Sequence, residues 1–166
     1  MMQEVLISDN LERDLAHAID VCAPDKLFVL TDKTTREHCW PKIEGFDCVK
    51  GVKLITIPST DEHKNIETLS MVWEMLSEQD ATRRSCLINL GGGMVTDLGG
   101  FAAATFKRGI SFINIPTTLL AMVDAAVGGK TGINFNGLKN EIGVFCPAQR
   151  VWIHTPFLHT LDADNL

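Results

Sequence analysis

The chain has 166 residues, of which 45% are hydrophobic and 22% charged, and its formal net charge at pH 7 is −6. These values predict one globular domain and argue against a general binder of nucleic acid or of membrane surfaces, which would carry excess lysine and arginine. No apolar run is long enough to span a membrane, and the N-terminus lacks the pattern of a signal peptide. Five scattered cysteines without C-x-x-C spacing predict free thiols in a reducing compartment, which we expect to be the cytoplasm.

Short apolar runs alternate with helical patterns along the chain. Strands are predicted over residues 4–8, 26–32, 52–58, 85–90, 111–116 and 150–154. Helices are predicted over residues 9–22, 34–44, 65–79, 94–106 and 117–127, with an irregular glycine-rich segment before the last strand. This alternation predicts an α/β fold with a Rossmann-like, mostly parallel sheet covered by helices on both faces.

The loops that follow four of these strands are candidates for ligand binding, because ligands of parallel sheets bind beyond the carboxyl ends of the strands. The loops comprise residues 31–32, 58–64, 91–93 and 116–118. The three glycines at 91–93 allow close approach of the backbone, and a helix that begins there favours a pyrophosphate. A tight turn without a ligand is the alternative. The stretch is not the usual dinucleotide fingerprint, because Thr96 replaces its third glycine, and Asp124 likewise excludes a P-loop at GGKT.

Two acidic residues, Asp97 and Asp124, lie among apolar neighbours in predicted helices. A buried carboxylate needs a partner, which would be a capping amide, a lysine or the hydroxyl groups of a ligand. Residues 91–144 carry four basic and three acidic residues within an otherwise acidic chain, which favours a phosphorylated anionic ligand. Gly99 and Gly100, inside the same helix as Asp97, are expected to allow close packing against the sheet.

The glycine-rich half of the chain closely resembles the 3-dehydroquinate synthases. GGG-x3-D is followed at matched spacing by KRG, PTTLLAMVD, GGKTGIN and GLKN-x-IG, and the likeness extends upstream to TD at 31–32 and PSTDEHKN at 58–65. The resemblance implies that residues 1–166 form an NAD-binding domain, followed in the family by a helical zinc-binding domain that this chain lacks. The implied reaction converts 3-deoxy-D-arabino-heptulosonate 7-phosphate into 3-dehydroquinate and phosphate, a lyase step of the shikimate pathway of aromatic amino acid biosynthesis.

The same resemblance implies roles for individual residues. Asp32 would hold the adenosine ribose, and Asp61 stands where the family has glutamate. Arg108 would reach the substrate phosphate of the partner subunit in a homodimer. The full set of implied NAD contacts is Asp32, Asp61, Lys64, Gly92, Gly93, Met94, Asp97, Thr117, Thr118, Leu120, Asp124, Lys130, Lys139, Thr160 and Leu161. The implied catalytic and substrate-binding residues are Lys130, Asp124, Asn140 and Arg108.

The resemblance assigns no metal ligand to this chain, because the zinc ligands of the family lie beyond the equivalent of residue 166. We therefore expect the isolated chain to be inactive. A related sugar-phosphate cyclase and a stand-alone NAD-binding module are the alternative functions. Lys130, Lys139 and Asn140 argue against the module, since they suit a phosphorylated sugar-acid substrate. Neither nucleic acid nor a membrane is an expected partner.

Overall fold

A six-stranded parallel sheet forms the centre of the protein. The computed structural model describes residues 4–125 and 128–161. The strands of the sheet are β1 (Glu4–Ile7), β2 (Leu27–Asp32), β3 (Lys53–Ile57), β4 (Cys86–Gly91), β5 (Ser111–Pro116) and β8 (Arg150–Ile153). They lie in the order β1-β8-β5-β4-β2-β3, and every pairing is parallel. The predicted α/β, Rossmann-like class is therefore confirmed.

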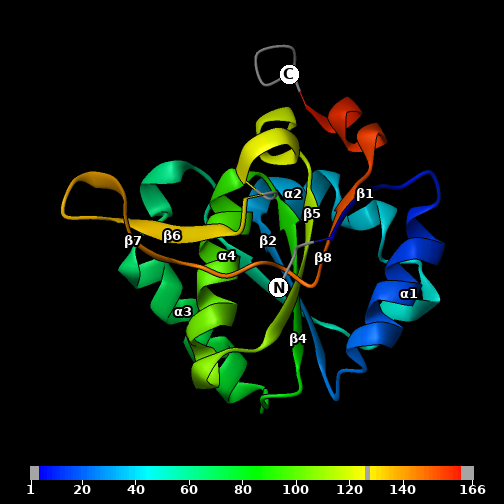
Figure 1. The fold of residues 1–166 in the computed structure, drawn as a ribbon, viewed down its shortest axis with the longest axis horizontal. Helices are drawn as coiled ribbons and strands as arrows, with labels where there is room; N and C mark the ends of the chain where they lie inside the picture. The colour runs from blue at the N-terminus through cyan, green and yellow to red at the C-terminus, as the bar shows by residue number, and fades with distance from the viewer. Residues whose placement is uncertain (1–3, 126–127, 162–166) are drawn as a thin grey trace.

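Helices cover both faces of this sheet (Figure 1). One face is covered by α1 (Leu11–Cys22) and by the turns after α2 (Lys33–His38), and the other by α3 (Ile66–Glu78) and α4 (Gly93–Thr105). Neighbouring residues of a strand point to opposite faces, so the sheet separates two apolar clusters. In β4, for example, Leu87 packs with α3 and α4, whereas Ile88 packs with α1.

Polar side chains fix where the helices begin. Asn10 caps α1 by accepting a hydrogen bond from the backbone of Arg13 at 3.1 Å. Asn65 caps α3 in the same way. The helix predicted over residues 34–44 is wrong in its length. It ends at His38, and a 3₁₀ turn follows over Trp40–Lys42 because Pro41 cannot continue an α-helix.

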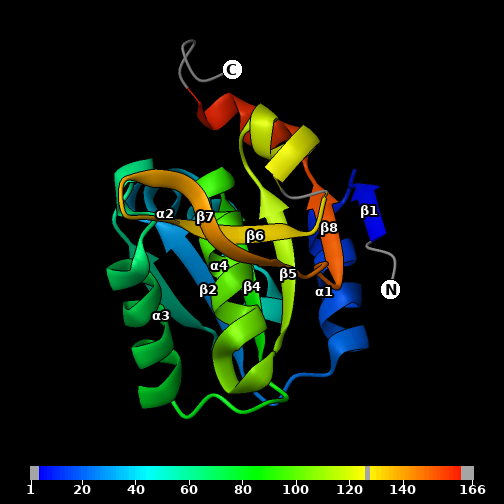
Figure 2. The same cartoon turned by 60° about the vertical axis from the view of Figure 1, so that its left-hand side comes forward.

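The glycine-rich segment predicted to be irregular is in fact a two-stranded antiparallel ribbon. It consists of β6 (Lys130–Phe135) and β7 (Leu138–Phe145), and it lies across α4 (Figure 2). Asn136 and Gly137, with φ of 53° and 77°, form the hairpin turn, and Asn-Gly is a strong hairpin signal. Before the ribbon, the helix predicted over residues 117–127 is present in part: residues 119–120 are α-helical and lead into a short π-helix, Ala121–Ala125. Residues 126–127 of that prediction lie outside the described residues.

Two glycines of α4 allow close packing. A Cβ on Gly99 would lie 2.0 Å from Oδ1 of Asn89, a buried β4 residue whose amide also donates to Asn114 of β5 at 3.0 Å. A Cβ on Gly100 would lie 2.6 Å from Cγ2 of Thr131 in β6. The packing role predicted for these glycines is therefore confirmed, with Gly99 facing the sheet and Gly100 facing mainly the ribbon.

Candidate functional site

The order of the strands opens a crevice at one edge of the sheet. The chain leaves β2 toward β3 but leaves β4 toward β5, which lies in the opposite direction. A reversal of this kind separates the loops beyond the carboxyl ends of the two strands. A cavity of about 780 Å³ lies at this place and receives residues from all four loops singled out in the sequence. Seven predicted cofactor contacts line it together, namely Asp32, Gly92, Thr117, Thr118, Leu120, Thr160 and Leu161.

Asp32 is held at the wall of this crevice by the start of α2. Its Oδ1 accepts hydrogen bonds from the backbone N–H of Thr35 at 2.7 Å and from the Thr35 hydroxyl at 3.2 Å. Its Oδ2 has no hydrogen-bond partner among residues 4–125 and 128–161. Asp32 is thus both a helix cap and a carboxylate with one oxygen available to a ligand hydroxyl.

The first turn of α4 borders the same crevice. Gly92 precedes the helix without a side-chain cap, and Gly93 and Met94 form its first residues. The free backbone N–H groups of a first turn and the helix dipole together favour an anion. A Cβ on Gly92 would already lie 3.0 Å from Cγ2 of Thr118, so a larger residue would crowd this wall. Met94 also packs against the core.

Threonines and one cysteine form the floor of the crevice. Thr117 is only 1% exposed, and its hydroxyl has no hydrogen-bond partner among the described residues, although it borders the cavity. The hydroxyl of Thr160 lies 3.6 Å from Sγ of Cys39, and burial raises the pKa of that thiol. Thr118 accepts a hydrogen bond from the backbone of Ala121. Cys39 was not predicted as a site residue, because nothing in its local sequence distinguishes it from a core cysteine.

Lys64 links the loop after β3 to α4 and to the ribbon. The residue is 4% exposed, and its Nζ lies 2.8 Å from Oδ2 of Asp97 and 2.5 Å from Oδ1 of Asn140. The lysine partner considered for Asp97 is thereby confirmed, but it comes from 33 positions upstream rather than from a nearby basic residue. Burial of the ammonium group is compensated by these two oxygens.

A second cavity lies between this network and the ribbon. Its volume is about 460 Å³, and Asp97, Lys130, Asn140 and Glu141 contribute polar groups to its wall. The structure therefore brings together two predicted substrate contacts, Lys130 and Asn140, beside a predicted cofactor contact. Apolar and small residues of both ribbon strands form the rest of the wall.

Four other predicted site residues lie apart from the two cavities or outside the described part of the chain. Asp61 is exposed, and its Oδ2 accepts a hydrogen bond from Nδ2 of Asn134 at 3.2 Å. Lys139 is exposed on β7. Arg108 is exposed just beyond the far end of α4, about 20 Å along the helix axis from the crevice. The side chain of Asp124 lies outside the part that the structure describes.

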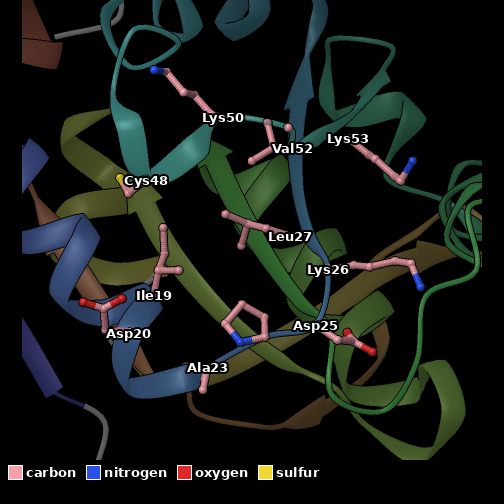
Figure 3. Close-up of a pocket in the computed structure, with 12 residues that line it drawn as sticks. Ile19, Asp20, Ala23, Asp25, Lys26, Leu27, Cys48, Lys50, Val52 and Lys53 are labelled. Carbon is pink, nitrogen blue, oxygen red and sulfur yellow. The ribbon is translucent and has the colours of Figure 1, made fainter.

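Another hollow, of about 460 Å³, lies at the opposite edge of the sheet, by the amino ends of β2 and β3 (Figure 3). Its floor is apolar, and its lysine side chains extend away from Leu27 and Ile19 (Figure 3). Each of these three ammonium groups has a protein partner, because Lys26 contacts Asp80 O, Lys50 contacts Asp47 and Lys53 contacts Gln79. This hollow offers no set of groups suited to the predicted chemistry.

The described residues are 4–125 and 128–161. Within these ranges, no group of three histidine, cysteine, aspartate or glutamate side chains has an arrangement that could hold a metal ion. The residues in these ranges therefore do not form a site for the zinc that the resemblance implies. None of the helices within these ranges has the length and apolar character needed to cross a bilayer.

The parallel sheet and the crevice at its switch point define a Rossmann-like α/β domain of the kind found in enzymes that bind dinucleotides. The family model described as 3-dehydroquinate synthase N-terminal matches residues 54–166. This chain belongs to the 3-dehydroquinate synthase family.

Individual relatives agree with this assignment. The chain is 51% identical to a 3-dehydroquinate synthase of Parabacteroides distasonis over 99% of its own length and 46% of that protein. It is 43% identical to the corresponding protein of Clostridium tetani, with 96% and 43% covered. The structure of a 2-epi-5-epi-valiolone synthase from Streptomyces hygroscopicus with NAD+ and Zn2+ bound has a TM-score of 0.87 at 30% identity, with 99% of this chain and 46% of that one covered. The chain thus spans about half the length of the relatives it matches.

Proposed function

We propose that this chain forms the cofactor-binding half of a 3-dehydroquinate synthase. The enzyme would convert 3-deoxy-D-arabino-heptulosonate 7-phosphate into 3-dehydroquinate and phosphate. The observation that supports this proposal best is the crevice at the switch point, which gathers seven predicted cofactor contacts from four separate segments. The family match and the likeness to a synthase with NAD+ bound support the same function.

The residues of the crevice fit NAD in three ways. The available oxygen of Asp32 would accept a hydrogen bond from a ribose hydroxyl, as acids at this place do in NAD-binding folds. The first turn of α4, from Gly92 onward, would receive the pyrophosphate on its backbone N–H groups. The buried hydroxyl of Thr117 would find a partner in the ligand, which removes the cost of leaving it without one.

The substrate would occupy the adjoining cavity beside Asp97. Lys130 would supply a positive charge for the carboxylate or phosphate of the substrate, and the Asn140 amide would orient a hydroxyl. When bound, NAD supplies a transient oxidation of a ring hydroxyl that acidifies the neighbouring C–H bond. The residues of this chain orient substrate and cofactor, and the ribbon covers part of the cavity. In a homodimer, Arg108 would act in the site of the partner subunit, in keeping with its distance from the crevice.

Titration with NAD in a calorimeter tests the proposal. We expect the chain to bind NAD, and Asp32→Asn to weaken binding by about tenfold, because the amide retains the cap acceptor but loses the charge that favours the ribose hydroxyl. Asp47→Asn is a matched control, since Asp47 forms an exposed ion pair with Lys50 away from the crevice. If Asp32→Asn and the wild type bind NAD with equal affinity, Asp32 does not contact the cofactor. Failure of the wild type to bind NAD would contradict the proposal.

A related sugar-phosphate cyclase is the second candidate. The likeness to a 2-epi-5-epi-valiolone synthase at 30% identity supports this second candidate. The two candidates differ in product, so they are separated by product analysis of an enzyme in which this chain is fused to the complementary half of a relative, assayed on open-chain sugar phosphates with and without a carboxylate. Turnover of the seven-carbon acid alone supports the synthase, whereas turnover of a neutral sugar phosphate supports the other cyclase.

A further inference from the structure

Asn134 lies at an irregularity of the ribbon. The ribbon pairs Ile133 with Ile142 and Phe135 with Leu138, so the single residue Asn134 faces the three residues 139–141 of β7. Bulges of this type turn backbone and side-chain groups out of the ladder and are common beside active sites. The backbone N–H of Asn134 accordingly leaves the ribbon and donates to the carbonyl oxygen of Lys64 at 2.7 Å.

The side-chain amide of Asn134 also connects two segments. Its Nδ2 donates to the backbone carbonyl of Asp61 at 3.1 Å and to Oδ2 of Asp61 at 3.2 Å. Its Oδ1 accepts a hydrogen bond from the backbone N–H of Asn140 at 2.9 Å. Asn140 has a φ of 53°, a conformation that non-glycine residues seldom adopt and that needs support from its surroundings.

These contacts close a ring. Asn134 holds the backbone of both Lys64 and Asn140, and the side chains of those two residues meet with Nζ 2.5 Å from Oδ1. The same ammonium group also contacts Asp97 of α4. Through this ring, the loop of residues 58–64, which carries Asp61, is held to the part of the ribbon that borders the proposed substrate cavity.

We infer that Asn134 is a positioning residue that holds the Asp61–Lys64 loop and Asn140 in one joint arrangement, and so links cofactor binding to the substrate cavity. This inference rests on the proposed function. Asn134 contacts neither of the two cavities itself, and it acts through Asp61, Lys64 and Asn140. Its amide is suited to this task because it supplies donors to a carboxylate on one side and an acceptor to an N–H on the other.

Asn134→Asp tests the inference with an almost isosteric change. The new carboxylate of residue 134 still accepts the hydrogen bond from the backbone N–H of Asn140, but it can no longer donate to Asp61. It also repels the Asp61 carboxylate, which carries the same charge. We expect NAD affinity to fall by about tenfold. Adding Asp61→Asn restores a donor–acceptor pair between positions 61 and 134, so the double variant should bind NAD more tightly than the two single losses together predict. Asn136→Asp in the hairpin turn is the matched control and should bind as the wild type does.

Hydrogen exchange of the backbone amides gives a readout that does not depend on NAD. In Asn134→Asp, exchange should accelerate in peptides covering residues 58–65 and 134–140, while α4 keeps its protection. The inference is overturned if Asn134→Asp matches Asn136→Asp in exchange, or if the double variant shows no recovery of NAD affinity. If the wild type binds no NAD, the proposed function fails, and the exchange data alone decide whether Asn134 holds the loop.

Discussion

At the scale of single residues, Gly99 shows how one missing side chain sets the distance between a helix and a sheet. In an ordinary helix interior, alanine is more stable than glycine by about 1 kcal/mol. Here an added Cβ would meet Oδ1 of Asn89 at 2.0 Å and Cδ2 of Leu30 at 2.8 Å, and neither buried side chain has room to move. The local preference and the tertiary packing therefore predict effects of opposite sign.

We expect Gly99→Ala to lower the free energy of unfolding by about 1 to 3 kcal/mol, because overpacking outweighs the gain in helix propensity. Urea denaturation measures the change. Gly45→Ala is the control, since a Cβ there meets nothing within 4 Å and should leave stability almost unchanged. A stabilising effect of Gly99→Ala would show that α4 lies farther from the sheet than the structure indicates.

Cysteine chemistry gives a second test at this scale. A hydrogen bond with Cys86, aided by the charge of Arg150, lowers the pKa of Cys22 to about 7. The pKa of Cys86 is raised by the same hydrogen bond and by burial, and burial also raises the pKa of Cys39, Cys48 and Cys146. Only Cys22 therefore has a large thiolate fraction near neutral pH.

Alkylation by iodoacetamide at pH 7.5, followed by mass spectrometry, should label Cys22 several-fold faster than the other four cysteines. Because its folded-state pKa is depressed, the labelling rate should rise through about pH 7 rather than about pH 9. In Cys86→Ala, the rise should move to higher pH. A midpoint for Cys22 near that of an ordinary thiol would contradict the contact between the two sulfur atoms.

At the scale of elements, the strands were predictable because each is a short apolar run with a polar or glycine-rich end. The ribbon was not predicted, since its glycines lower strand propensity when each is considered alone. Those glycines are needed where its strands approach, as a Cβ on Gly143 would lie 1.9 Å from the carbonyl oxygen of Thr131. The sequence also predicts only some of the site residues. Asp32 and Thr117 could be found because they end or follow strands, but no local signal reveals that Lys64 pairs with Asp97 or that Asn134 holds Asp61.

The contact between α4 and β6 can be tested with a compensating pair. Gly100→Ala should destabilise the protein by about 1 kcal/mol, because the new Cβ would lie 2.6 Å from Cγ2 of Thr131. Thr131→Ser removes that methyl group and keeps the hydroxyl that donates to Val144 O at 2.7 Å. The double variant should therefore be more stable than Gly100→Ala alone in thermal unfolding. Additive losses would mean that the ribbon does not rest on Gly100.

At the scale of the whole molecule, this chain covers 46% of its Parabacteroides distasonis relative and 43% of its Clostridium tetani relative. Only a few polar groups surround the cavity of about 460 Å³ that Lys130 borders. A relative of high identity can supply the part of the enzyme that complements this chain. The proposed activity can then be measured on the fusion of the two.

We expect residues 1–166, fused in place of the matching part of the Parabacteroides distasonis synthase, to give an enzyme that releases phosphate from the heptulosonate. Lys130→Ala in this fusion should lower kcat/KM by about 100-fold, because a charge that meets the anionic substrate is lost. Lys53→Ala, beside the remote hollow, is the control and should leave the rate unchanged. The unfused chain should release no phosphate, and measurable turnover by it would contradict the division of the site.

The pairing of β1 with β8 has a consequence for how the protein is made. Glu4 pairs with Arg150, so β1 leaves the ribosome long before β8, the strand beside which it lies in the sheet. At roughly 5 to 20 residues per second, β8 is synthesised roughly 7 to 30 s after β1. The central strands β2 to β5 can assemble during that delay, whereas β1 waits without a neighbour. Sheet completion is therefore tied to the timing of translation, and a chaperone that shields Val5 and Leu6 would act within this interval.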